Sequence, residues 1–103
     1  MGRHGFEKRY LGIVRSVAPM GLVVISMGRR RPIPLGSKAY FRDDSGEYKE
    51  LGVVVDFIGN VERPHAVVRV YDRSLLSGIA VGLDVMYELK PPRGRRGVVR
   101  RGG

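Results

Sequence analysis

Short apolar runs separated by glycine and proline set the strongest limit on how this chain can fold. No window keeps the 3.6-residue apolar period of an amphipathic helix, and the stretch at 72–82 fits either one helical turn or a loop. Six short strands with Gly-rich turns predict a small all-β barrel, because closing a sheet removes the exposed edges that invite aggregation. A two-sheet sandwich is the alternative. The expected strands are residues 10–18, 21–27, 38–41, 51–58, 65–71 and 83–90.

Length and residue usage limit the classes of protein that fit. With 103 residues the chain forms one small domain, which leaves little room for a buried catalytic cavity. It has no cysteine, so neither disulfides nor thiolate metal sites can stabilise it. No apolar run approaches the roughly 18 residues of a membrane-spanning helix, and the start, MGRHGFEKRY, lacks the apolar core of a secretory signal. We therefore expect a soluble cytoplasmic protein.

The excess of basic residues is concentrated near the ends of the chain. Lys and Arg number 19 against 10 acidic residues. We expect a basic N-terminal arm at 1–9, a barrel domain at 10–90 and a disordered Arg/Gly-rich tail at 91–103. Guanidinium groups contact phosphates and stack on bases, so the tail and the GRRRP loop are candidate RNA contacts. Solvated segments without a partner are the alternative. The candidates are Arg29, Arg30, Arg31, Arg93, Arg95, Arg96, Arg100 and Arg101.

Side-chain alternation predicts which face of three strands points inward. The expected inward sets are Leu51, Val53, Val55 and Phe57; Ala66, Val68 and Val70; and Leu83, Val85, Tyr87 and Leu89. The opposite faces still carry the apolar side chains of Val54, Ile58, Val67, Tyr71 and Met86. A contiguous apolar patch on an outer face marks a partner surface, unless a loop or a terminal arm covers it.

Catalytic groupings are sparse in this sequence. His4 and His65 lie far apart without metal-ligand spacing, and Asp43-Asp44 precede Ser45-Gly46 as in an ordinary turn. No Ser/His/Asp pattern and no phosphate-binding loop is found. We therefore expect no enzymatic activity, and a small enzyme stays as a third alternative behind the two binding functions considered next.

The motifs LGIVRSV and GLVVI, followed by LGVVVDFIGNVERPHAVVRV and VGLDVMYEL, resemble one known family. It is the glycine–arginine-rich subunit of H/ACA ribonucleoproteins, in its short archaeal form. The resemblance covers about residues 10–90, and its most specific part is the ordered run D-x-x-G-x-V-x-x-P after a Gly-Val strand. Asn60, His65 and Phe57-Ile58 depart from the family pattern. The matching residues are Gly12, Val14, Pro34, Gly36, Gly52, Val54, Asp56, Gly59, Val61, Pro64, Gly82, Val85 and Tyr87.

The resemblance implies a six-stranded split barrel similar to translation-factor barrels. It also implies a non-catalytic subunit that binds the catalytic domain of a pseudouridine synthase, away from the guide RNA, without cofactor or metal. Such a subunit assists substrate loading and product release in rRNA pseudouridylation, a step of ribosome biogenesis. RNA would be contacted indirectly or through the basic tails. The alternative is an RNA-binding barrel of ribosomal-protein or translation-factor type, with its affinity in Arg29, Arg30 and Arg31.

Mapping the family pattern onto this chain gives a candidate docking loop. The resemblance implies Phe57, Ile58, Gly59, Val61, Pro64 and His65 as its residues. The outward-face argument alone adds Val54, Val67 and Tyr71. Together these nine residues form the predicted protein-docking site.

Overall fold

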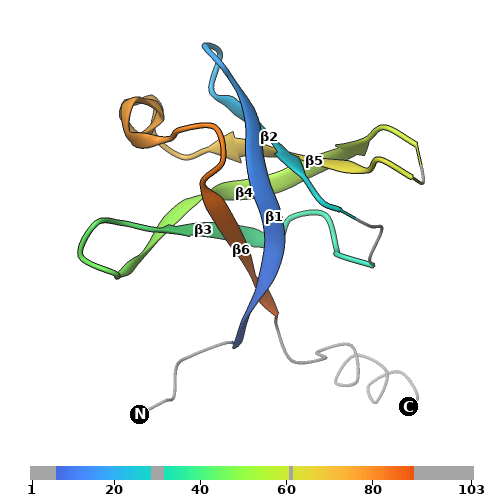
Figure 1. Ribbon diagram of the computed structural model, residues 1–103, viewed down its shortest axis with the longest axis horizontal. Helices are drawn as coiled ribbons and strands as arrows, with labels where there is room; N and C mark the ends of the chain where they lie inside the picture. The colour runs from blue at the N-terminus through green and yellow to red at the C-terminus, as the bar shows by residue number, and fades with distance from the viewer. Residues whose placement is uncertain (1–6, 29–31, 61, 90–103) are drawn as a thin grey trace, which may run out of the picture.

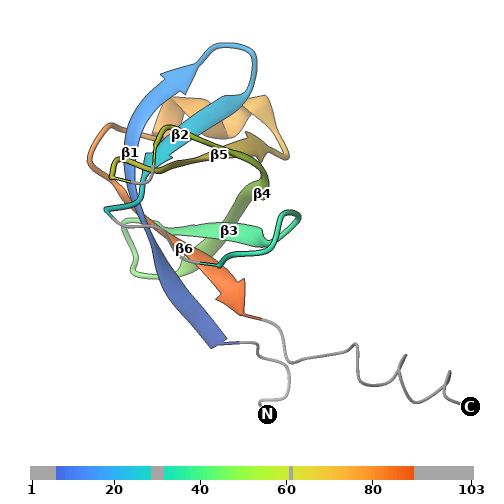
Figure 2. The same ribbon diagram turned by 90° about the vertical axis from the view of Figure 1, so that its right-hand side faces the viewer.

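Six antiparallel strands form a closed barrel in the computed structural model, which describes residues 7–28, 32–60 and 62–89 (Figure 1). Around the barrel the strands follow the order β1-β2-β5-β4-β3-β6, and Figure 2 looks into the ring that they make. The all-β barrel predicted from the sequence is confirmed. Its elements are β1 (Glu7–Ala18), β2 (Leu22–Ser26), β3 (Lys38–Arg42), β4 (Tyr48–Ile58), β5 (His65–Val70), the 3₁₀ helix η2 (Arg73–Gly78) and β6 (Asp84–Leu89).

The barrel closes where its first and last strands pair, with Glu7 opposite Leu89. Because β1 begins at Glu7, Lys8 and Arg9 belong to a strand and not to the expected basic arm. β4 likewise begins at Tyr48, three residues before the expected strand at 51–58. Both strands run beyond their apolar stretches because a neighbouring strand offers backbone partners there.

Aliphatic side chains fill the interior, and each fully buried one stabilises the fold by about 1.5–3 kcal/mol. The largest fully buried side chains are Leu11, Val14, Val23, Ile25, Leu51, Val54, Val68 and Val85. The inward sets predicted for β5 and β6 are confirmed. Ala66, Val68, Val70, Val85 and Tyr87 belong to the core cluster, and Leu83 and Leu89 pack against it.

The alternation predicted for β4 is wrong in its middle. Val54 is fully buried in the core cluster, whereas Val53 and Val55 are half-buried outside it. Two register shifts explain this difference: Leu51 is an extra residue against β3, and Val55 is an extra residue against β5. Between them Gly52 faces inward, where a Cβ atom would lie 1.9 Å from the Arg69 carbonyl oxygen.

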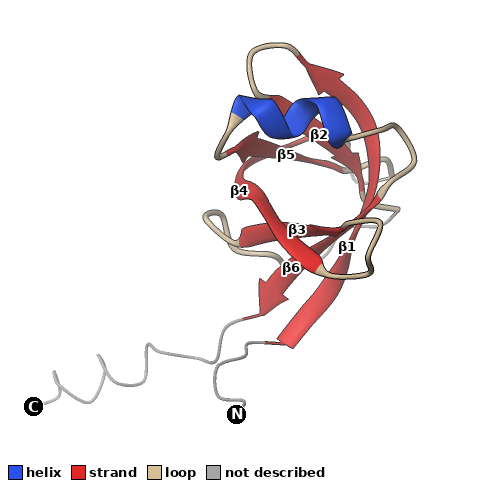
Figure 3. Cartoon of the chain, turned by 90° about the vertical axis from the view of Figure 1, so that its left-hand side faces the viewer, coloured by secondary structure: helices blue, strands red, loops and turns tan. Residues whose placement is uncertain are grey.

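The 3₁₀ helix η2 lies beside β5 over one end of the barrel (Figure 3). The Asp72 carboxylate caps it by accepting a hydrogen bond from the Ser74 backbone N–H at 2.9 Å, which lowers the pKa of Asp72. Leu76 and Ile79 pack against the core. The alternative of a loop at 72–82 is thus replaced by a short helix followed by a turn. None of the helices among the described residues is long and apolar enough to span a bilayer.

Candidate docking wall of the barrel

One cross-strand row on the outside of the barrel combines two exposed isoleucines with two polar side chains. Backbone pairing aligns Ile13 of β1, Ser26 of β2, His65 of β5 and Ile58 of β4. The adjacent, inward row comprises Val14, Ile25, Ala66 and Phe57, which form or pack against the core. Since successive residues of a strand point to opposite faces, the first row points outward. Ile13 is 39% and Ile58 46% exposed, so the row presents apolar surface at both ends.

A second outward row runs parallel to the first. It comprises Ser16, Val24, Val67 and Asp56 on the same four strands. Val67 is buried although it lies outside the core cluster, so its neighbours on the outer face cover it. The Asp56 carboxylate accepts a hydrogen bond from the Phe57 backbone N–H at 2.8 Å. We call these two rows, Ile13, Ser26, His65, Ile58, Ser16, Val24, Val67 and Asp56, the docking wall.

The loop between β4 and β5 borders the docking wall, and its described residues, 59–60 and 62–64, are held by local contacts. Gly59 has a φ of 89°, and a Cβ atom there would lie 2.3 Å from the Arg63 carbonyl oxygen, so only glycine fits. The Asn60 side-chain oxygen accepts hydrogen bonds from the backbone N–H groups of Glu62 (3.0 Å) and Arg63 (2.8 Å). This is an Asx-type turn, in which the asparagine side chain takes the place of a backbone acceptor.

Pro64 connects the same loop to the residue that follows β2. Its side chain is buried, and its carbonyl accepts a hydrogen bond from the Met27 backbone N–H at 3.1 Å. Gly59, Asn60 and Pro64 therefore hold the loop against the end of β2 before any partner arrives.

A pocket of about 290 Å³ opens between this loop and β1–β2. Its lining residues are Arg15, Ser26, Gly28, Glu62, Arg63 and His65. A register shift between Val14 and Ser16 leaves Arg15 without a partner residue on β2. The ion pairs found within the described ranges join other residues: Arg9–Glu7, Lys38–Glu50 and Lys49–Asp43. Arg15 and Arg63 thus reach the pocket without a carboxylate within salt-bridge distance in the described part of the chain.

The opposite side of the barrel carries a contrasting group of side chains, here called the tyrosine cluster: Lys8, Tyr40, Arg42, Tyr48 and Glu88. The Lys8 ammonium lies 4.5 Å from the centre of the Tyr40 ring and 5.3 Å from that of Tyr48, and the Arg42 guanidinium lies 4.9 Å from the Tyr48 ring. The Tyr40 hydroxyl donates to the Glu88 carboxylate at 3.2 Å. Burial, followed by the Glu88 and Glu50 charges, raises the pKa of Tyr40 to about 12. Each polar group of the cluster is thus engaged internally.

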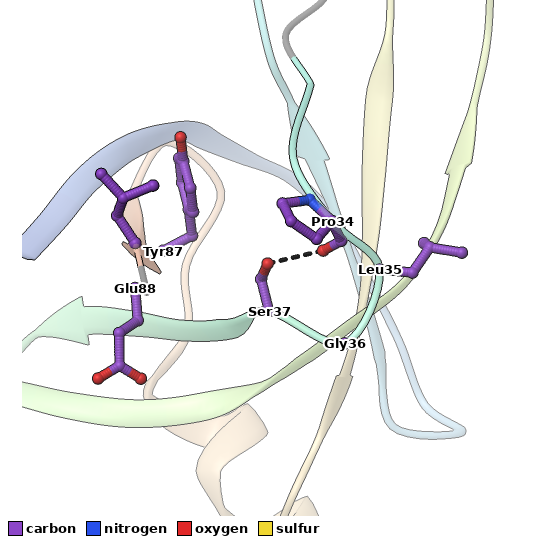
Figure 4. Close-up of a pocket in the computed structure, with 7 residues that line it drawn as sticks. Pro34, Leu35, Gly36, Ser37, Tyr87 and Glu88 are labelled. Carbon is purple, nitrogen blue, oxygen red and sulfur yellow. Dashed lines mark hydrogen bonds between the residues drawn. The ribbon is translucent and has the colours of Figure 1, made fainter. Parts of the chain in front are cut away.

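A smaller cavity of about 150 Å³ lies between the turn before β3 and the end of β6 (Figure 4). The Ser37 hydroxyl donates to the Pro34 carbonyl at 2.6 Å and fixes the turn. Glu88 points away from Tyr87 in the close-up, and its carboxylate already holds the Tyr40 hydroxyl. Of the lining residues, Glu88 alone is charged, so the cavity offers no free charge for ligand binding.

The structure brings together only part of the predicted docking site. Ile58 and His65 lie in one outward row, with Val67 in the next and Gly59 and Pro64 in the bordering loop. The outward placement of Val54 is wrong, because it is fully buried in the core, and Phe57 is half-buried against the core.

Tyr71 is separated from the remainder of the predicted site. It is exposed, but it follows the far end of β5, about 20 Å along the strand from His65. Its charge contributes to the raised pKa of Tyr40, which places it on the side of the tyrosine cluster. Figure 1 shows the β4–β5 loop and η2 at opposite ends of the barrel. Val61, Arg29, Arg30, Arg31, Arg93, Arg95, Arg96, Arg100 and Arg101 lie outside the described residues.

Most residues of the wall and its pocket escape the sequence reasoning, and the most important of them are Ile13, Arg15 and Arg63. The strands at 10–18 and 21–27 are correctly predicted, but alternation alone does not show that Ile13 aligns with Ser26 and His65. Arg15 reaches the pocket at a register shift, which depends on pairing and leaves no mark in the local pattern.

Comparison of the chain with models of protein families, with curated proteins and with solved structures finds no match.

Proposed function

We propose that this protein is a non-catalytic accessory subunit of an H/ACA guide-RNA ribonucleoprotein that works in the cytoplasm of an archaeal-type cell. Its docking wall binds the catalytic domain of the pseudouridine synthase subunit. The observation that carries the proposal is the outward row with Ile13 and Ile58 exposed at its two ends, next to a loop whose described residues are held by local contacts. The family resemblance supplies the identity of the partner.

The physical properties of the wall suit a protein partner. Exposed isoleucines lose water on docking, and an interface of this kind owes most of its affinity to a few such buried side chains. The β4–β5 loop is held by Gly59, Asn60 and Pro64, so little conformational entropy is lost when it binds. Protein interfaces combine apolar contacts with direct hydrogen bonds, and the row offers both, with isoleucines at its ends and Ser26 and His65 between them.

In this proposal the synthase performs the chemistry, and the barrel affects the steps before and after it. The isomerisation of uridine belongs to an aspartate of the synthase. The accessory subunit supports substrate loading and product release by contacting a mobile loop near that active site. No cofactor or metal has a part in this role.

The test is association of the full chain with its synthase subunit, measured by co-purification and by titration. Ile58→Asp places a charge in the apolar end of the wall, and we expect affinity to fall on the order of 30-fold, as for an interface hot spot. Met20→Asp is the control, because Met20 is 65% exposed in the β1–β2 turn, away from the wall. Wild-type association of Ile58→Asp with an unchanged melting temperature would rule out this docking wall.

A further inference from the structure

We propose that the pocket beside the docking wall, lined by Arg15, Ser26, Gly28, Glu62, Arg63 and His65, binds a backbone phosphate of RNA. This goes beyond the proposed function, which gives the wall a protein partner only. It also departs from the family resemblance, which places the subunit away from the guide RNA.

The first support is the state of the charges around the barrel. Arg9, Lys38 and Lys49 each pair with a carboxylate, and Lys8 and Arg42 lie against tyrosine rings. Arg15 and Arg63 have neither kind of partner within the described residues, yet both line one pocket. Each guanidinium presents five N–H donors in a planar fork that matches a phosphate group.

The second support is the other lining of the pocket. His65 and Ser26 are neighbours across β5 and β2, and both add polar side chains to the lining of the pocket. Glu62 is the acidic member, and its charge is exceeded by those of the two arginines. The pocket therefore favours an anion, and its volume of about 290 Å³ is ample for a phosphate group with its ester oxygens.

The sequence that follows the pocket residue Gly28 favours a polyanion over a single carboxylate as the ligand of the pocket. Gly28 lines the pocket and leads directly into Arg29, Arg30 and Arg31. A single acidic side chain of a protein would need only the pocket itself. A chain of phosphates would gain from the pocket and also from the excess of basic residues in the sequence, a net charge of +9, so RNA is the better complement.

The position of the pocket gives the proposal a consequence for the whole assembly. Ser26 and His65 belong both to the pocket and to the outward row of the docking wall. An RNA strand held there would lie at the edge of the protein interface. The barrel would then contact protein and RNA at adjoining positions of one surface.

The experiment uses the full chain without synthase and a fluorescein-labelled oligouridylate as probe. Affinity is measured over a range of salt concentrations for wild type, Arg15→Gln, Arg63→Gln and the control Arg9→Gln. Arg9 carries the same charge but pairs with Glu7 near the start of β1, about 20 Å along the strand from Arg15. The tail arginines are present in every variant, so differences between Arg63→Gln and Arg9→Gln report on the pocket.

We expect Arg15→Gln and Arg63→Gln each to weaken binding several-fold, and their combination about tenfold, with a salt slope smaller by about 0.7 per lost contact. Amide NMR shifts on titration with the oligonucleotide should centre on Gly28, Glu62, Arg63 and His65. Equal affinity and slope for the pocket variants and Arg9→Gln, or shifts elsewhere, overturn the proposal.

Loss of synthase association in Arg63→Gln with unchanged RNA binding also overturns it, because the pocket then holds an acidic protein segment. The RNA assay contains no synthase. Its outcome is therefore independent of the Ile58→Asp test of the docking wall.

Discussion

The docking wall and the tyrosine cluster lie on the same barrel but use their polar groups in opposite ways. In the tyrosine cluster, Lys8 and Arg42 lie against aromatic rings and Glu88 holds the Tyr40 hydroxyl. Beside the docking wall, Arg15 and Arg63 line an open pocket without a carboxylate partner in the described residues. The charged groups of the tyrosine cluster have partners within the chain. The arginines beside the docking wall remain available to bind another molecule.

This difference separates stability from binding within one small domain. Changes in the tyrosine cluster should lower the free energy of unfolding and leave association intact. Changes in the docking wall should act on association, and changes in its loop should act on association as well as on stability. Four predictions test this division, beginning with the largest effect.

Gly59→Ala should have the largest effect, because its φ of 89° disfavours a side chain and the new Cβ would meet the Arg63 carbonyl. We expect about 3 kcal/mol of destabilisation or a rearranged loop, with loss of synthase association. Gly46→Ala in the β3–β4 turn is the matched control. Its φ is 91°, but no atom lies within 4 Å of the added Cβ, so only about 1 kcal/mol should be lost. Urea unfolding measures both; equal losses would contradict the close-contact argument.

Raising the pH should weaken the fold through Tyr40. Its pKa of about 12 in the folded state exceeds the ordinary value of 10.0, so folding favours the protonated phenol. The resulting stabilisation is complete below pH 10 and is lost as the pH rises through 12, by about 2 kcal/mol. Chemical unfolding at several pH values between 9 and about 12 measures the decline. Tyr40→Phe should show a flatter profile over this range, and an equally steep one would exclude Tyr40 as its source.

Tyr40→Phe should itself cost about 1.5 kcal/mol at neutral pH. The change removes the hydrogen-bond donor to the Glu88 carboxylate, and Glu88 is a residue only 9% exposed, so few water molecules can replace the lost donor. Synthase association should remain at the wild-type level, because the cluster lies away from the docking wall. Reduced association of a folded Tyr40→Phe protein would show that the two surfaces are coupled.

Asn60→Ala should have the smallest effect on stability, about 0.5–1 kcal/mol, with a several-fold loss of association. The variant loses the acceptor for the Glu62 and Arg63 N–H groups and loosens the loop. Asp43→Ala is the control, because Asp43 likewise accepts from the Ser45 and Glu47 N–H groups in the β3–β4 turn. Binding by titration should separate the variants. If Asp43→Ala weakens association as much as Asn60→Ala does, a well-ordered β4–β5 loop is not what association requires.

Much of the fold follows from local sequence. The apolar runs and the Gly-rich turns locate six strands, and alternation identifies Ala66, Val68 and Val70 as core residues because β5 is regular along its length. The same alternation argument fails for β4. Leu51 is an extra residue relative to β3 and Val55 is an extra residue relative to β5. A pattern read along one strand contains no information about such pairings.

The candidate site divides in the same way. Ile58 and His65 could be found because the loop between them carries a recognisable run of residues. Ile13, Arg15 and Arg63 could not, because they join the wall only through the alignment of β1 with β2 and β5. Val54 was assigned to the outer face by a count that ignores the extra residues of β4.

The pairing of Glu7 with Leu89 also determines how the barrel responds to force. In this antiparallel pair, the start of β1 and the end of β6 lie side by side. A force that pulls these two chain ends apart acts on the hydrogen bonds between β1 and β6 one after another. It does not load all of them at the same time. We therefore expect the β1–β6 seam to open from its Glu7–Leu89 end, so that Ile13 of the docking wall, opposite Asp84 at the other end, separates from β6 last.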